Sequence, residues 1–167
     1  GQVTLAKQAN RYLEKTQALD EGLLDAIYDN PLRYLERHPA GLKIRGEREL
    51  ALFALQRVAR GATYPAHALY IPIKDHFSEA DQGFFLGKLA DPAARRFQPE
   101  ALGWYREAAA LAPLSDEQLG WRVRSALRVK SWREVIAAVD AMSPREQRAP
   151  AWRYWKARAL KANTRLG

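Results

Sequence analysis

The chain has 167 residues, of which 47% are hydrophobic and 28% charged; this composition excludes disorder and fits one compact domain or a few stacked repeats. It contains no cysteine, which excludes disulfides, thiolate zinc sites and a cysteine nucleophile. The longest wholly apolar run, Leu50 to Leu55, is far shorter than the roughly 20 residues of a membrane-spanning helix, so we expect no membrane span.

Helix signals follow one another along the chain, and strand signals are almost absent. Asn30-Pro31 and Asp91-Pro92 each predict the end of one helix, and Pro72 predicts a break or kink. The predicted helices cover residues 4–18, 20–29, 31–37, 43–60, 64–76, 79–90, 99–111, 116–129, 132–142 and 150–163.

Several helix ends carry local signatures. Capping boxes, in which a serine and a side chain three residues later satisfy exposed backbone N–H groups, are predicted at Ser78–Asp81, Ser115–Gln118, Ser131–Glu134 and Ser143–Glu146. Pro99 and Pro150 are predicted as first-turn prolines, and Gly61 as the cap at the end of the 43–60 helix.

Residues 121–127 and 154–160 repeat one pattern at an offset of 33, matching aromatic to aromatic, Ala to Ala and Leu to Leu. A repeat of this length is typical of stacked helix pairs. We therefore expect an all-α fold, a right-handed superhelical α-solenoid similar to tetratricopeptide repeats. It would be one continuous domain, with N-terminal helices in residues 1–42 and helix-pair repeats in residues 43–167. Neither end looks capped, so we expect a piece of a longer protein.

No set of residues predicts catalysis or cofactor binding. His38, His67 and His76 show no metal-ligand spacing, and no nucleophile or phosphate-binding motif is present. The neighbouring carboxylates Glu47/Glu49 and Asp116/Glu117 are more typical of surface ion pairs than of a glycosidase pair facing one cleft. We expect no catalytic residue, cofactor or metal in this segment.

The net charge of +8 is concentrated in the C-terminal part, where residues 101–167 hold 13 Lys and Arg against 6 Asp and Glu. This asymmetry indicates either an anionic partner or a solvated basic face. Basic residues alternate with tryptophans, as in surfaces that bind phosphates and bases or an acidic polysaccharide. The alternative, which we favour for the tryptophans, is packing between successive helices. The candidate substrate-contact residues are Arg122, Arg124, Arg128, Lys130, Arg153 and Lys156.

Five phrases, in order, resemble the superhelical part of soluble lytic murein transglycosylases: YDNPLRYLERH, RELALFALQRVAR, PEALGWYREAAAL, DEQLGWRVRSALRVKSWREVIAAVDAM and PAWRYWKARAL. The resemblance covers most of residues 25–163. It implies a periplasmic enzyme that cleaves the MurNAc-GlcNAc β-1,4 bond of peptidoglycan and leaves a 1,6-anhydro sugar, with a lysozyme-like catalytic domain after the helices. The family's catalytic Glu-Ser pair and Gly-Leu-Met-Gln stretch are absent here, so this segment would be a non-catalytic scaffold that positions murein strands.

The resemblance also implies the partners, namely peptidoglycan through the parent protein and a C-terminal catalytic domain on the same polypeptide; we expect a monomer. Two alternatives remain open. One is a tetratricopeptide-like module that binds a protein, although the usual motif residues of that repeat are not reproduced. The other is a basic helical domain that binds nucleic acid, which we rank last because no recognised reader motif is present.

Overall fold

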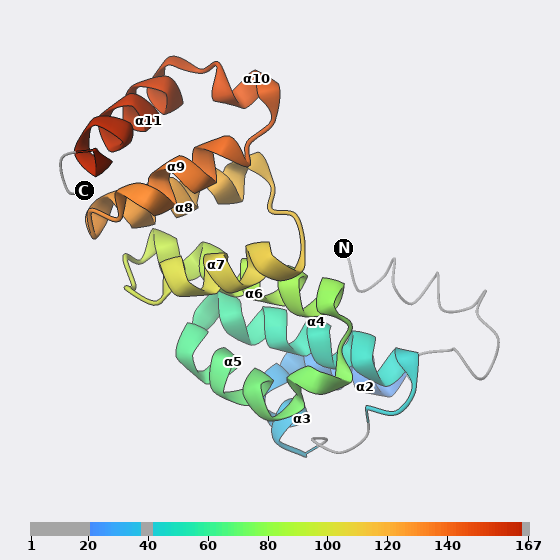
Figure 1. The fold of residues 1–167 in the computed structure, drawn as a ribbon. Helices are drawn as coiled ribbons and strands as arrows, with labels where there is room; N and C mark the ends of the chain where they lie inside the picture. The colour runs from blue at the N-terminus through green and yellow to red at the C-terminus, as the bar shows by residue number, and fades with distance from the viewer. Residues whose placement is uncertain (1–20, 38–41, 165–167) are drawn as a thin grey trace. The chain divides into compact units, whose positions relative to one another are not determined.

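The computed structural model describes residues 21–37 and 42–164, and these residues form helices joined by short turns, with no strand among them (Figure 1). The all-α expectation is therefore confirmed for this part of the chain. The helix predicted over residues 4–18 lies outside the described residues. Contacts divide the chain into two compact units, residues 1–85 and residues 86–167, and the division falls within a helix.

The first unit is built around one long buried helix. Its elements are α2 (Glu21–Asp29), α3 (Pro31–Arg37), α4 (Arg45–Gly61), α5 (Thr63–Tyr70), the 3-10 helix η1 (Ile71–His76) and the first part of α6 (Glu79–Arg95). α4 packs against α3 and α5 and buries Leu50, Leu55 and Val58. The ring of Tyr70 lies 4.7 Å from that of Phe85 and closes this core. The break predicted at Pro72 is confirmed, since α5 ends at Tyr70.

The second unit stacks helices in sequence order. After the end of α6 come α7 (Ala101–Leu111), α8 (Asp116–Arg128), α9 (Trp132–Asp140), the short α10 (Pro144–Gln147) and α11 (Pro150–Asn163). α8 packs on α7 and α9, and α9 packs on α11. Val135 and Val139 of α9 face this core, where they are buried beside Val123 and Ala159.

The predicted end of a helix at Asp91-Pro92 is wrong, because α6 continues through Pro92 to Arg95. A proline inside a helix costs about 3 kcal/mol through a lost hydrogen bond and a steric clash. Around Pro92 the helix buries four apolar side chains, Leu89, Ala90, Ala93 and Ala94. Burial along this face outweighs the local penalty of the proline.

The predicted serine caps do not all form. Ser115 and Gln118 form the predicted capping box, with each side chain accepting the other residue's backbone N–H. Ser131 makes no side-chain cap, and the Glu134 side chain, which would supply the other half of the box, binds arginines of other helices instead. Ser143 accepts the N–H of Glu146 at 3.3 Å and so caps α10, a helix missing from the prediction. The helix boundary predicted at Asn30-Pro31 is confirmed, since α2 ends at Asp29 and α3 begins at Pro31. Of the two first-turn prolines, Pro150 begins α11 as expected, whereas α7 begins after Pro99. Gly61 is the last residue of α4 and has no positive φ.

Helices α6 and α8 end in the same way, 33 residues apart. Phe97 and Lys130 have φ values of 61° and 55°, and they are the only non-glycine residues with positive φ in the described part of the chain. In each turn the next residue donates its N–H back to the helix, Gln98 to Ala93 and Ser131 to Ala126, both at 2.9 Å. This hydrogen-bond pattern is a Schellman motif, in which glycine is the usual left-handed residue.

Replacing Lys130 with glycine is expected to stabilise the protein by about 0.5–1 kcal/mol, because a Cβ in the left-handed region is strained and glycine is not. The measurement is the urea unfolding midpoint at unchanged slope. Lys130→Ala is the control: it removes the charge and retains the Cβ, so it should give no gain. Equal stabilisation by both substitutions would show that charge rather than backbone conformation is responsible.

Candidate functional site

Basic and aromatic side chains of the second unit alternate in a stack formed by Arg95, Trp121, Arg124 and Trp152, here named the cation–aromatic stack. The guanidinium carbon of Arg95 lies 5.3 Å from the ring centre of Trp121. That of Arg124 lies between two indoles, 5.0 Å from Trp121 and 5.2 Å from Trp152. The four residues come from α6, α8 and α11, so the stack links three helices.

Local features hold the stack in place. Gly120 lets the indole of Trp152 approach α8, because a Cβ at that position would lie 3.2 Å from the Trp152 ring. The Trp152 indole N–H donates to Glu146 at 3.0 Å, and Arg95 forms an ion pair with Glu117 at 2.7 Å. Glu146 and Glu117 thus offset part of the positive charge along the stack.

The arrangement determines which ligand chemistry is available. Guanidinium groups already cover faces of Trp121 and Trp152, so these faces are not free to stack on sugars or bases. Arg124 is exposed, and a stacked guanidinium still presents its N–H edge, which suits carboxylate or phosphate oxygens. The stack can therefore bind an anionic group while its tryptophans pack helices together.

Arg122 lies on the opposite side of α8 from the cation–aromatic stack. Its side chain is buried, with 7% of the residue exposed, and it forms an ion pair with Glu134 of α9 at 2.7 Å. Glu134 also pairs with Arg106 of α7 at 2.9 Å. Burial raises the pKa of Glu134, but the hydrogen bonds and charges of Arg122 and Arg106 outweigh this and lower it overall. Arg122 thus joins helices and offers almost no surface to a substrate.

The other candidate contact residues lie in more than one place. Arg128 donates to the Ala94 carbonyl at 3.3 Å and lies 4.0 Å from the ring centre of Phe97, joining the ends of α8 and α6. Lys130 is exposed in the turn after α8, and Arg153 is exposed on α11. Lys156 forms an ion pair with Asp140 at the end of α9. The six residues therefore do not make one site.

Two parts of the arrangement were not predicted from the sequence. Arg95 lies 26 residues before Trp121, and no spacing rule connects them. In the interior of the unit, the Tyr105 hydroxyl donates to Asp91 at 2.7 Å, and Gln118 donates to the other oxygen at 3.4 Å. Burial raises the pKa of Asp91 despite these bonds, and burial followed by the Asp91 charge raises that of Tyr105. Tyr105 is fully buried, whereas Asp91 and Gln118 are half-buried, and this position between helices indicates a structural role.

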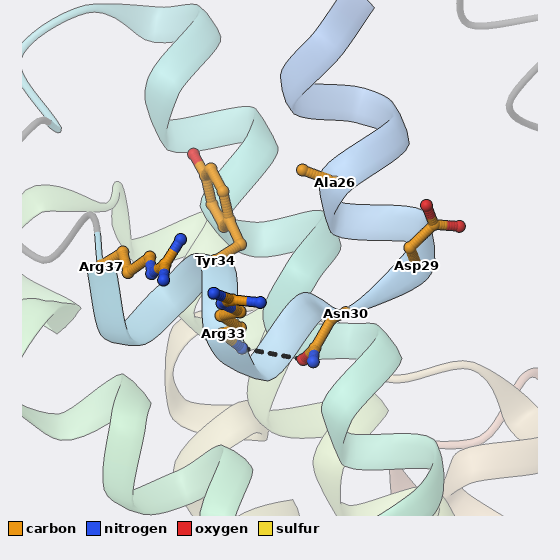
Figure 2. Close-up of a pocket in the computed structure, with 6 residues that line it drawn as sticks. All are labelled: Ala26, Asp29, Asn30, Arg33, Tyr34 and Arg37. Atoms are coloured by element: carbon orange, nitrogen blue, oxygen red, sulfur yellow. Dashed lines mark hydrogen bonds between the residues drawn. The ribbon is translucent and has the colours of Figure 1, made fainter.

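The first unit has a separate hollow of about 300 Å³ at the junction of α2 and α3 (Figure 2). Its lining residues are Ala26, Asp29, Asn30, Arg33, Tyr34 and Arg37. Asn30 caps α3 by accepting the backbone N–H of Arg33 at 3.0 Å. Figure 2 shows Arg33 and Arg37 extending from α3, and the Asp29 carboxylate extending from the end of α2. The hollow is cationic and open to solvent.

Across residues 21–37 and 42–164, no group of three or more His, Asp or Glu residues is placed to hold a metal ion. In the same residues, no helix combines the length and apolar character needed to cross a membrane. No protein-family model matches the chain, and no curated protein matches it significantly.

Proposed function

We propose that the chain is a scaffold segment of a periplasmic lytic murein transglycosylase, an α-solenoid of helix pairs that positions peptidoglycan strands for a catalytic domain elsewhere in the parent protein. The observation that carries the proposal is the ordered set of five transglycosylase-like phrases. They fall on the end of α2, on α3, α4, α7 and α11, and, in the longest phrase, on the α8–α9 pair.

Structural equivalences at an offset of 33 residues support the solenoid part of the proposal. The left-handed turns at Phe97 and Lys130 are one such pair. Gly87 and Gly120 are another: each is a position on α6 or α8 where a side chain of a later helix approaches closely, from Gln118 and Trp152 respectively. Repeated turns and repeated close approaches are what stacking of similar helix pairs produces.

The cation–aromatic stack is the surface through which murein contact is proposed. Peptidoglycan carries free carboxylates on its stem peptides, and Arg124 presents an exposed guanidinium that suits such groups. Arg153, exposed near the start of the neighbouring helix α11, adds a second cation. These two residues are chosen for the test because neither has the buried structural position of Arg122.

The test is co-sedimentation of the 167-residue chain with purified sacculi. The wild-type chain should be retained and should release no 1,6-anhydro muropeptides. Arg124→Gln with Arg153→Gln should weaken retention about tenfold or more, since one charge-assisted hydrogen bond contributes about 1.5–3 kcal/mol and about 1.4 kcal/mol corresponds to a factor of ten. Arg145→Gln with Arg148→Gln, on exposed positions of and next to α10, is the charge-matched control and should have no effect.

Failure of the wild-type chain to bind sacculi would remove the murein-contact role. The family assignment has its own test, because the parent open reading frame should also encode a lysozyme-like domain with a catalytic glutamate. Absence of that domain would contradict the assignment.

The second candidate is a helix-repeat module that binds a protein partner, and the 33-residue equivalences favour it as much as they favour the first. Specific capture of one protein by the chain, together with no affinity for sacculi, would support this alternative.

A further inference from the structure

The turn after α6 and the turn after α8 form one surface, named here the basic tip: Arg95, Arg96, Phe97, Arg128, Val129 and Lys130. Arg128 connects them through its hydrogen bond to Ala94 and its stacking on Phe97. Figure 1 shows both turns at the same edge of the second unit. The tip is therefore a single feature formed by residues some 30 positions apart.

The tip combines positive charge with exposed apolar side chains. Residues 93–99 and 125–133 contain five Lys and Arg and no Asp or Glu. Glu117, reached from α8, pairs with Arg95 and offsets one of these charges. Phe97 and Val129 are 67% and 56% exposed, although each is flanked by cations. Apolar side chains projecting from a basic surface are typical of proteins that dock on anionic membranes.

The backbone gives an independent reason to assign the tip a role. Phe97 and Lys130 occupy left-handed positions at which glycine is favoured, and their side chains are kept at a conformational cost. Neither side chain fills the core: Phe97 is mostly exposed, and Lys130 is exposed. Backbone strain of this kind clusters at functional sites, so the two outward-facing side chains point to a use beyond the contact that Phe97 makes with Arg128.

We propose that the basic tip docks the protein on the surface of an anionic lipid bilayer, with Phe97 and Val129 entering the headgroup region and the cations contacting lipid phosphates. This inference goes beyond the murein role and does not depend on it. A lipid surface fits better than nucleic acid because Val129 cannot stack on a base. In addition, Arg128 already covers one face of the Phe97 ring, so that face is not available for stacking on a base.

The test is sedimentation of the 167-residue chain with vesicles of phosphatidylglycerol and phosphatidylcholine, compared with phosphatidylcholine alone. Binding is expected only to the anionic vesicles and should weaken with added salt. Phe97→Gly and Lys130→Gly are the informative variants, since glycine adopts the left-handed conformation of both positions without strain and the fold should be preserved. Lys130→Gly removes one cation and should weaken partitioning onto the anionic vesicles about 5-fold. Phe97→Gly removes the aromatic ring and should weaken it about 10-fold.

The control pair Arg145→Gln/Arg148→Gln removes two exposed cations elsewhere in the same unit and should reduce binding less than the glycine variants do. Three outcomes would overturn the proposal: no binding to anionic vesicles, equal loss in the control, or unchanged binding in the double glycine variant. Tighter binding to single-stranded DNA than to vesicles, lost in the glycine variants, would assign the tip to nucleic acid instead. Sacculus binding should survive the glycine substitutions, which separates this test from that of the proposed function.

Discussion

Replacing Glu134 with alanine is expected to lower the free energy of unfolding by about 3–5 kcal/mol, the largest single effect anticipated in this chain. The side chains of Arg122 and Glu134 are only 9% and 16% exposed, so removal of the carboxylate leaves a buried guanidinium without its partner. The melting temperature should fall by about 2–4 °C for each kcal/mol lost, measured by circular dichroism.

Two controls separate burial from charge. The exposed pair Arg95–Glu117, with side chains 54% and 73% exposed, should lose no more than about 1 kcal/mol when Glu117 becomes alanine. The double replacement Arg122→Met/Glu134→Leu removes both charges together and should be far less damaging than Glu134→Ala alone. A double variant as unstable as the single one would show that packing, not an unpaired charge, determines the loss.

The same pair predicts a pH dependence. The folded-state pKa of Glu134 lies below its ordinary value of 4.5, so folding favours the ionised carboxylate. Its stabilisation is complete above pH 4.5 and is lost as the pH falls through the folded-state pKa. Wild-type protein should therefore lose more stability than Glu134→Gln between pH 5 and strongly acidic solution, as followed by urea unfolding. Parallel loss in the two proteins would contradict the assignment.

Replacing Gly120 with leucine is the second large effect, an expected loss of about 2–3 kcal/mol. A Cβ added at Gly120 would lie 3.1 Å from an Arg124 nitrogen and 3.2 Å from the Trp152 ring. A larger side chain must push α11 away from α8 and disrupt the cation–aromatic stack. Unfolding by urea measures the loss, and a change in tryptophan fluorescence of the folded state should accompany it.

Gly103 in α7 provides the matched control, because no atom lies within 4 Å of a Cβ built there. Gly103→Ala should gain about 0.5–1 kcal/mol from helix propensity alone. Gly120→Ala should show little or none of this gain, since its Cβ requires Trp152 and Arg124 to shift by a few tenths of an ångström. Equal gains at both positions would show that the helices are not tightly packed at Gly120.

Helix positions could be predicted well because their signals are local. The Ser115–Gln118 box and Pro150 each lie within one turn of the helix end they define, and the sequence displays both partners. The failures arise where a distant group competes. Glu134 was expected to cap α9, but arginines on α7 and α8 bind it instead. Likewise, burial along α6 overrides the stop expected at Pro92.

The candidate site was harder to predict for the same reason. The sequence showed that Arg and Trp alternate in residues 121–158, but not which of them face each other. Arg122 and Arg124 differ by two positions, so one lies in the interior and the other on the stack. Arg95 joins Trp121 only through the packing of α6 against α8. Helix periodicity can separate faces, whereas partners on other helices depend on the tertiary fold.

The Glu134 carboxylate also determines the axial register of three helices. Apolar side chains such as Val135 and Val139 would tolerate a small slide of α9 along its neighbours, because apolar contacts are weakly directional. Glu134 meets Arg106 from α7 and Arg122 from α8 at 2.9 and 2.7 Å, so a slide by one turn would break both ion pairs at once. The buried charges thereby restrict α7, α8 and α9 to one alignment, which the hydrophobic core by itself would not enforce.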